Sequence, residues 1–126
     1  MNILREIKDS VTLEKYLTDR RQQLIVERLL HLVVEAATDT NNHVLSATQQ
    51  SPPDDYYSSF PEAAKVGLIS PDLAARLAPS TGLRNRLVHD YDDLDNVVVY
   101  HSIEFALVGY AEYVLHVQDY LAQHQD

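Results

Sequence analysis

The feature that most constrains this chain is the stretch over residues 12–49, which contains neither proline nor glycine. Apolar side chains recur along it at helical spacing, at Leu17, Leu24, Ile25, Leu29, Leu32, Val33, Ala36 and Ala37. A run this long favours helix, because strands are short and are bounded by turn residues. We therefore expect one helix over residues 12–49, or two helices with a bend near Thr18 and Asp19.

Local start and stop signals predict shorter helices on either side of this stretch. Residues 2–9 can form a short helix at the beginning of the chain. After the long helix, the prolines at 52 and 53 break the backbone regularity. A helix over residues 57–66 is then expected to end at Gly67, since glycine readily ends a helix.

A further helix is expected to start at Ser70-Pro71, an N-cap residue followed by proline at the first helical position. We predict that it extends over residues 71–89 with a kink near Pro79. Residues 90–93 follow as a loop, and a final helix is expected over residues 96–123. Within it, Val97-Val98-Val99-Tyr100 favours strand by composition, but a lone strand has no partner here, so we expect helix.

These elements predict an all-α fold, a four- to five-helix up-and-down bundle that forms a single domain over residues 1–126. The length lies near the commonest size of one domain. The last helix is apolar on nearly every side, at Ile103, Phe105, Ala106, Leu107, Val108, Tyr110, Tyr113, Val114 and Leu115. Such coverage indicates burial against more than one neighbour, and the commonest closed arrangement is a homodimer.

Composition excludes several classes of protein. The chain has no cysteine, which excludes disulfides, thiolate zinc sites and a cysteine nucleophile. Its formal net charge of −9 disfavours a general nucleic-acid coat, although it permits an enzyme that cuts RNA at one small basic cleft. No stretch approaches the ~20 apolar residues that cross a bilayer, and the first residues lack the apolar core of a signal peptide. We therefore expect a cytoplasmic protein with no membrane contact.

The segment whose side chains are best suited to catalysis is Arg84-Asn85-Arg86-Leu87-Val88-His89-Asp90-Tyr91. An arginine fork matches a phosphate, a histidine exchanges protons near neutral pH, and the asparagine amide can orient either group. One reaction that joins these groups is cleavage of an RNA phosphodiester by its own 2′-hydroxyl. In it, His89 would act as base or acid and Arg84 would neutralise charge on the phosphorane, with no metal and no cofactor.

Helical geometry limits how these side chains can meet. Asn85 and His89 are four residues apart and share one helix face, whereas Arg84 and His89 diverge by about 140°. Three arrangements bring Arg84 and His89 to one phosphate. The arginine curls around, the helix ends near His89, or two copies of the segment meet across a dimer axis.

The pattern Arg84-Asn85 followed by His89 and Tyr91 resembles the RNxxxHxY signature of the HEPN superfamily. The long helix with Glu35 and Asp39 and the Gly67-to-Ser70 step resemble HepT, the toxin half of HepT–MntA toxin–antitoxin modules (type VII). The resemblance covers about residues 16–120.

This resemblance implies a homodimeric, metal-independent endoribonuclease whose two motif helices converge at the dimer interface. Arg84 and His89 would be the catalytic pair, assisted by Asn85. The substrate would be transfer RNA first and mRNA second. The partner MntA, a nucleotidyltransferase, would neutralise the toxin by transferring AMP from ATP to Tyr91.

Bland alternatives stand beside these functional interpretations. Arg84 can pair with Glu35 while His89 caps its own helix. Glu35 and Asp39 either orient Arg84 and Asn85 from behind or belong to a solvated helix face. The pairs His31 with Glu35 and Asp39 with His43 lack a third ligand, which disfavours a metal site.

Arg86, Tyr56 and Tyr57 each have two possible roles as well. Arg86 either touches RNA or pairs with an aspartate of the following loop. Tyr56 and Tyr57 either stack on a base or pack against the protein. For the whole chain, the rival functions are a non-catalytic HEPN-family module for binding or assembly and a plain structural dimer.

Overall fold

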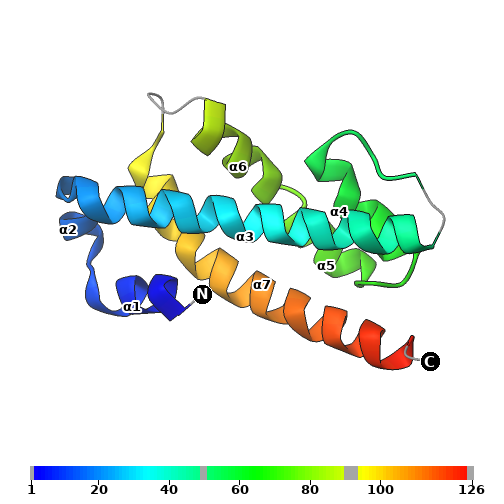
Figure 1. Ribbon diagram of the computed structural model, residues 1–126. Coiled ribbons are helices and arrows are strands. Elements are labelled where there is room, and N and C mark those ends of the chain that lie inside the picture. Colours follow the sequence, from blue (N-terminus) through cyan, green and yellow to red (C-terminus); the bar gives the residue numbers. More distant parts are fainter. Residues whose placement is uncertain (1, 49–50, 90–93, 125–126) are drawn as a thin grey trace.

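A computed structural model describes residues 2–48, 51–89 and 94–124. In these ranges every regular element is a helix (Figure 1), which confirms the predicted all-α fold. The helices are α1 (Asn2–Ser10), α2 (Leu13–Thr18), α3 (Arg20–Ala47), α4 (Tyr56–Lys65), α5 (Pro71–Leu77), α6 (Ser80–His89) and α7 (Asn96–Gln123). The described residues thus form seven helical segments rather than four or five, because two of the predicted helices are divided.

The first division separates α2 from α3 at Asp19. This residue is extended (φ −115°, ψ 94°), and its side chain accepts a hydrogen bond from the Gln22 backbone N–H at 3.2 Å. An aspartate in this conformation is a good helix N-cap, so it starts α3 while it ends α2. The predicted bend near Thr18 and Asp19 is confirmed.

The second division separates α5 from α6 at Ala78 and Pro79. Proline has no backbone N–H and its ring clashes with the carbonyl four residues earlier, which interrupts a helix. The start of α5 matches the prediction, since the Ser70 hydroxyl accepts a hydrogen bond from the Leu73 backbone N–H at 3.1 Å. Gly67 has a φ of +85°, which suits the left-handed turn after α4.

The last helix, α7, starts at the predicted place. The Asp95 side chain accepts a hydrogen bond from the Val97 backbone N–H at 3.0 Å. The run Val97–Tyr100 is helical, as expected for a segment without a partner strand. No helix in the described part of the chain is long and apolar enough to cross a bilayer.

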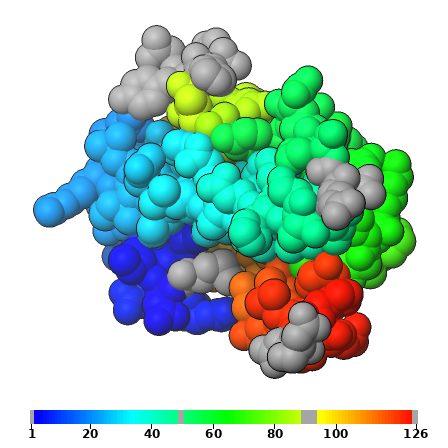
Figure 2. Space-filling model, turned by 45° about the vertical axis from the view of Figure 1, so that its right-hand side comes forward, coloured from blue at the N-terminus to red at the C-terminus, as the bar shows by residue number. Residues whose placement is uncertain are grey.

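The two long helices α3 and α7 run in the same direction (Figure 1). The chain returns from the end of α3 to the start of α7 through α5 and α6, which run in the opposite direction. The core lies where these helices meet. Its fully buried members come from most of the helices and include Leu4, Tyr16, Val26, Phe60, Leu73, Leu77, Val99 and Ile103. In Figure 2, α3 crosses the middle of the visible face with α6 above it and α1 and α7 below.

The apolar positions that identified the long helix mark its buried face only in part. Leu17 in α2 and Leu24 and Leu32 in α3 are exposed. The core-facing residues of α3 are instead Val26, Leu30, Val34, Ala37, Val44 and Leu45. Helical spacing is satisfied by both sets, so only the packing partners decide which face is covered.

Candidate active site on helix α6

Residues 84–89 of the motif form the end of α6. Arg84, Asn85 and His89 all belong to this helix, so Asn85 and His89 lie one turn apart on it. The side chain of His89 lies outside what the structure describes. Residues 90–93, which include the predicted modification site Tyr91, lie outside the described residues as well.

Arg84 points from α6 toward α3. Its Nη2 donates a hydrogen bond to Glu35 Oε1 at 2.8 Å, and its Nη1 donates to Asn85 Oδ1 at 3.1 Å. The Arg84 side chain is only 13% exposed, whereas Asn85 is exposed. Glu35 therefore holds Arg84 from behind, as one of the two sequence-based interpretations expects. The same contact is the ion pair that the structural alternative expects.

The guanidinium of Arg84 also lies over the ring of Tyr56, the first residue of α4. The distance from Arg84 Cζ to the ring centroid is 4.3 Å. From the sequence, Tyr56 is expected either to stack on a base or to pack against the protein. In the structure Tyr56 is partly buried, packs against the core and contacts the Arg84 guanidinium with its ring. No local signal joins these residues, because they lie on different helices far apart in the chain.

Glu35 is the centre of a chain of polar contacts on α3. His31 Nε2 lies 2.9 Å from the same Glu35 oxygen, and Arg28 Nη1 donates to His31 Nδ1 at 3.2 Å. The hydrogen bond from Arg84, followed by that from His31, holds the pKa of Glu35 below its usual value. Glu35 is thus ionised at neutral pH and keeps Arg84 in place.

Asp39 does not join this arrangement. It is exposed one turn beyond Glu35 and makes no hydrogen bond or ion pair with any described residue. Its role beside Arg84 or Asn85 stays a prediction. Within the described residues, no group of three His, Asp or Glu side chains is placed to hold a metal ion.

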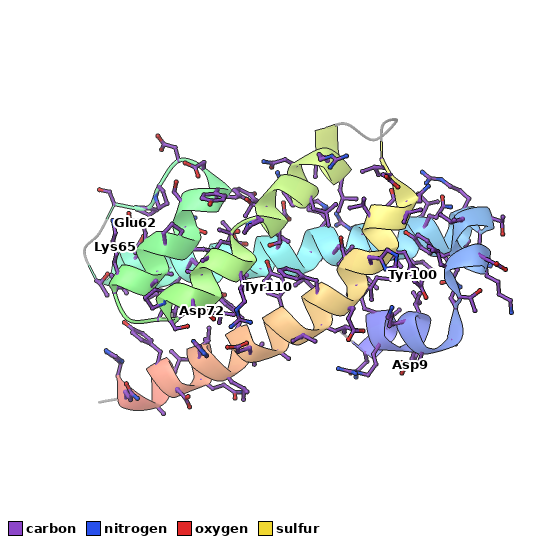
Figure 3. The ribbon with its side chains drawn as sticks, turned by 180° about the vertical axis from the view of Figure 1, so that it is seen from behind. Asp9, Glu62, Lys65, Asp72, Tyr100 and Tyr110 are labelled. Carbon is purple, nitrogen blue, oxygen red and sulfur yellow. The ribbon has the colours of Figure 1, made fainter. Side chains whose placement is uncertain are left out.

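A cavity of about 160 Å³ opens beside Arg84, between α3, α6 and α7. Its lining is mostly apolar and comprises Leu30, Val33, Val34, Pro79, Ser80, Leu83, Arg84, Leu87, Ser102, Phe105, Ala106 and Tyr110. Tyr110 of α7 lies toward the junction of α5 and α6, where its hydroxyl is 2.6 Å from Ser80 Oγ (Figure 3). Phe105 lines the cavity and is also exposed. The outer face of α7 therefore reaches the surroundings of Arg84.

That outer face of α7 is apolar. Val98 and Phe105 are exposed, and Val108 and Leu115 are each 60% exposed. Val98 and Phe105 are seven residues apart, as are Val108 and Leu115, so the two members of each pair lie along one side of the helix. We call these four residues the outer α7 face. Large exposed apolar side chains in such a row are typical of surfaces that contact another protein.

The elements that carry the site also carry basic side chains without acidic partners. Arg21 and Arg28 on α3 and Arg86 on α6 are exposed and form no ion pair with a described carboxylate. Elsewhere, Lys65 and Arg76 are paired with nearby glutamate or aspartate. Arg5 on α1 and Lys15 on α2 are also exposed and form no ion pair with a described carboxylate, so basic side chains of this kind lie on α1 and α2 as well as on α3 and α6.

Comparisons with known proteins agree with the motif. A family model described as "Ribonuclease HepT-like" matches residues 1–117. The chain is 44% identical over 113 residues to a tRNA nuclease HepT of Aphanizomenon flos-aquae, which covers 90% of this chain and 77% of that protein. It is 32% identical over 80 residues to an mRNA nuclease HepT of Shewanella oneidensis, which covers 64% of this chain and 60% of that protein.

The lowered pKa of Glu35 gives a pH-dependent stability. A carboxyl whose pKa is lower in the folded state stabilises the fold fully above its unfolded pKa, and this contribution is lost as the pH falls through the folded pKa. We expect Glu35→Gln to lower the free energy of unfolding at neutral pH, and the difference from wild type to shrink below about pH 4. Urea unfolding over a pH series measures this difference. Asp39→Asn is the matched control and should leave stability unchanged; a Glu35→Gln difference that persists at low pH would contradict the prediction.

Proposed function

Because the chain belongs to the HepT-like ribonuclease family, we propose that it is the toxin of a HepT–MntA toxin–antitoxin pair and cleaves RNA without a metal ion. The observation that carries this proposal is the fixed position of Arg84 between Glu35 and Tyr56. A guanidinium held this way by a carboxylate behind it and a ring across its face is a prepared site for a phosphate.

In the proposed reaction, Arg84 binds a nonbridging oxygen of the scissile phosphate. Its contacts to Glu35 and Asn85 use only part of its set of N–H donors. The negative charge on the phosphate oxygens grows as the phosphorane forms, so a cation fixed beforehand stabilises the transition state more than the ground state. The exposed Asn85 amide assists on the same helix.

His89 supplies the proton transfer. As a base it removes the proton of the ribose 2′-hydroxyl, and the 2′-oxygen forms a bond to phosphorus while the bond to the 5′-oxygen breaks. The protonated His89, of the same chain or of the second chain, gives a proton to the leaving 5′-oxygen, so the products are a 2′,3′-cyclic phosphate and a 5′-hydroxyl. Histidine suits either proton transfer because its pKa lies near neutral pH.

We place transfer RNA first among the substrates and mRNA second. A relative with 44% identity carries the name tRNA nuclease, and a more distant one carries the name mRNA nuclease. Arg21, Arg28 and Arg86, which form no ion pair with a described carboxylate, support an RNA substrate, because arginines near a cleavage site attract flanking phosphates. A cytoplasmic location, where such RNA is found, is part of the proposal.

The active form is proposed to be a homodimer in which the two motif segments converge. The outer α7 face is apolar, and Phe105 links it to the cavity beside Arg84. A second chain that covers this face would therefore come close to Arg84. The divergence of Arg84 and His89 around α6 gives a reason for using residues of two chains at one phosphate.

The proposed antitoxin is a MntA-type nucleotidyltransferase that modifies Tyr91. The tyrosine oxygen attacks the α-phosphorus of ATP, pyrophosphate leaves, and the hydroxyl proton is released. AMP attached two residues after His89 brings a bulky anionic group to the end of α6. Its negative charge would compete with RNA phosphates for the same arginines.

For the nuclease activity, we expect the wild-type chain to cleave transfer RNA in EDTA and both Arg84→Ala and His89→Ala to lose at least about a hundredfold in rate. Gel analysis of the fragments and their cyclic phosphate ends measures the activity, and circular dichroism checks that the helices remain. Lys65→Ala, a change on the exposed side of α4, is the control and should cleave as wild type does. Unchanged cleavage in the His89→Ala chain would refute the catalytic assignment, and a wild type without cleavage would favour a non-catalytic binding module.

For the dimer, we expect Val108→Lys to convert it to a monomer and to lose cleavage at the same time. A lysine at this exposed apolar position leaves the monomer fold intact but places charge in the proposed interface. Light scattering gives the mass, and the cleavage assay gives the activity. Ile3→Lys, an equally exposed apolar position on α1, should change neither quantity. A Val108→Lys chain that is monomeric and fully active would show that one chain suffices.

For the modification, we expect a mass gain of one AMP on Tyr91 when MntA and ATP are supplied, together with loss of cleavage. Tyr91→Phe removes the accepting oxygen, so that variant should gain no mass and should stay active in the presence of MntA. Peptide mass spectrometry locates the group. A gain of the same size on the Tyr91→Phe chain would show that another residue is the acceptor.

A further inference from the structure

Arg84 has a third support that the family motif does not contain. The guanidinium carbon Cζ of Arg84 lies over the ring of Tyr56, 4.3 Å from the ring centroid. Glu35 meets the same group at its edge, through Nη2. A ring contact limits how far the guanidinium carbon can move from the ring, and a carboxylate contact fixes the direction of the N–H group that it accepts from. The two contacts together restrain a side chain that otherwise has several rotatable bonds.

Tyr56 is itself held in place at the start of α4. Asp55 caps this helix, and its carboxylate accepts hydrogen bonds from the Ser58 backbone N–H at 2.7 Å and the Ser58 hydroxyl at 3.0 Å. The carbonyl oxygen of Tyr56 accepts a bond from the Ser59 hydroxyl, which in turn accepts one from the buried Asn41 amide of α3 at 3.1 Å. The backbone of Tyr56 is therefore fixed relative to α3, the helix that carries Glu35.

The neighbouring tyrosine provides a natural comparison. Tyr57 is 55% exposed and takes no part in the contacts to Arg84. It lines a separate shallow hollow with Pro61, Ala64 and Pro71 on the far side of α4. Two adjacent tyrosines thus differ in one respect that matters for the site, namely whether the ring lies against the guanidinium.

We propose that Tyr56 is a positioning residue of the ribonuclease site, whose ring holds the Arg84 guanidinium beside Glu35 before RNA binds. The inference rests on the proposed function of Arg84. The ring face provides the support, because the described contact involves the ring and the guanidinium. The phenol hydroxyl is therefore dispensable.

A positioning role affects the chemical step more than RNA binding. Arg84 stabilises charge that develops in the transition state, so its displacement lowers kcat, while flanking phosphate contacts keep KM nearly constant. A shift of about 1 Å in such a group costs up to about a hundredfold in rate. We expect Tyr56→Leu and Tyr56→Met to lower kcat at least about tenfold with a KM within about threefold of wild type.

The experiment compares these variants with two controls in the transfer RNA cleavage assay. Tyr56→Phe keeps the ring and should retain wild-type kcat within about twofold. Tyr57→Leu removes the exposed neighbouring ring and should also behave as wild type. Because Tyr56 packs on the core, unfolding curves accompany each variant, and the two ring-free replacements differ in shape so that one well-folded variant is enough.

A second measurement is independent of activity. A proton above an aromatic face resonates upfield, so the Arg84 side-chain N–H signals of the wild type should be shifted upfield in a proton–nitrogen spectrum. The Arg84→Ala variant identifies these signals. Tyr56→Leu should move them downfield, whereas Tyr56→Phe and Tyr57→Leu should leave them in place.

The outcomes distinguish an error in the proposed ribonuclease function from an error in the positioning role of Tyr56. If Arg84→Ala and His89→Ala cleave RNA as wild type does, the proposed function itself is wrong. If those variants are inactive while Tyr56→Leu retains full kcat, or while Tyr56→Phe loses as much as Tyr56→Leu, the positioning role of Tyr56 is wrong. A loss confined to the ring-free Tyr56 variants, together with the downfield movement, establishes it.

Discussion

The packing of α3 along α7 is the constraint on which the rest of the structure depends, because the flanking helices take their places against one or both of them. A buried polar link crosses this contact. The Tyr113 hydroxyl donates toward Ala37 O and Asn41 Oδ1, and Asn41 donates to Ser59 of α4. Buried polar groups need partners, so these bonds fix the rotation of the helices. Burial raises the pKa of the Tyr113 phenol, which therefore remains a donor. Gly109 of α7 allows a close approach to α5, since a Cβ there would lie 2.8 Å from Leu77 Cδ2.

This framework places a largely buried cation, which burial by itself would disfavour, beside an acidic partner. α6 packs against α3, which brings Arg84 to Glu35, and α4 packs against both, which brings Tyr56 across the guanidinium. A charge that is largely withdrawn from water needs a partner, and Glu35 provides it. The ion pair with Glu35 is compatible with both a structural and a phosphate-binding role of Arg84, because a contact on one side of a guanidinium leaves its other donors for a ligand. Stability and the proposed phosphate binding therefore share one carboxylate.

Local signals predicted much of the fold. The bend near Asp19, the helix start at Ser70, the start of the last helix at residue 96 and the interruption near Pro79 lie where the sequence places them, since each depends on the backbone within a few residues. The motif at 84–91 also indicated the ribonuclease family, which the family model and a 44% identical relative confirm. The roles of Arg84, Asn85, His89 and Tyr91 stay predictions, and those of Glu35 and Asp39 do as well. Of the last two, only Glu35 lies in contact with Arg84.

The sequence by itself determined the helices, their ends and the family, because these depend on short-range backbone chemistry and on a contiguous motif. Tertiary structure alone decided which side of α3 is buried, since two apolar stripes satisfy the same helical spacing and Leu24 and Leu32 prove exposed. It also decided that Tyr56 rather than Tyr57 meets Arg84. Adjacent residues on a helix point about 100° apart, so the rotation of α4 about its axis selects one of them. That rotation is set by side chains from other helices.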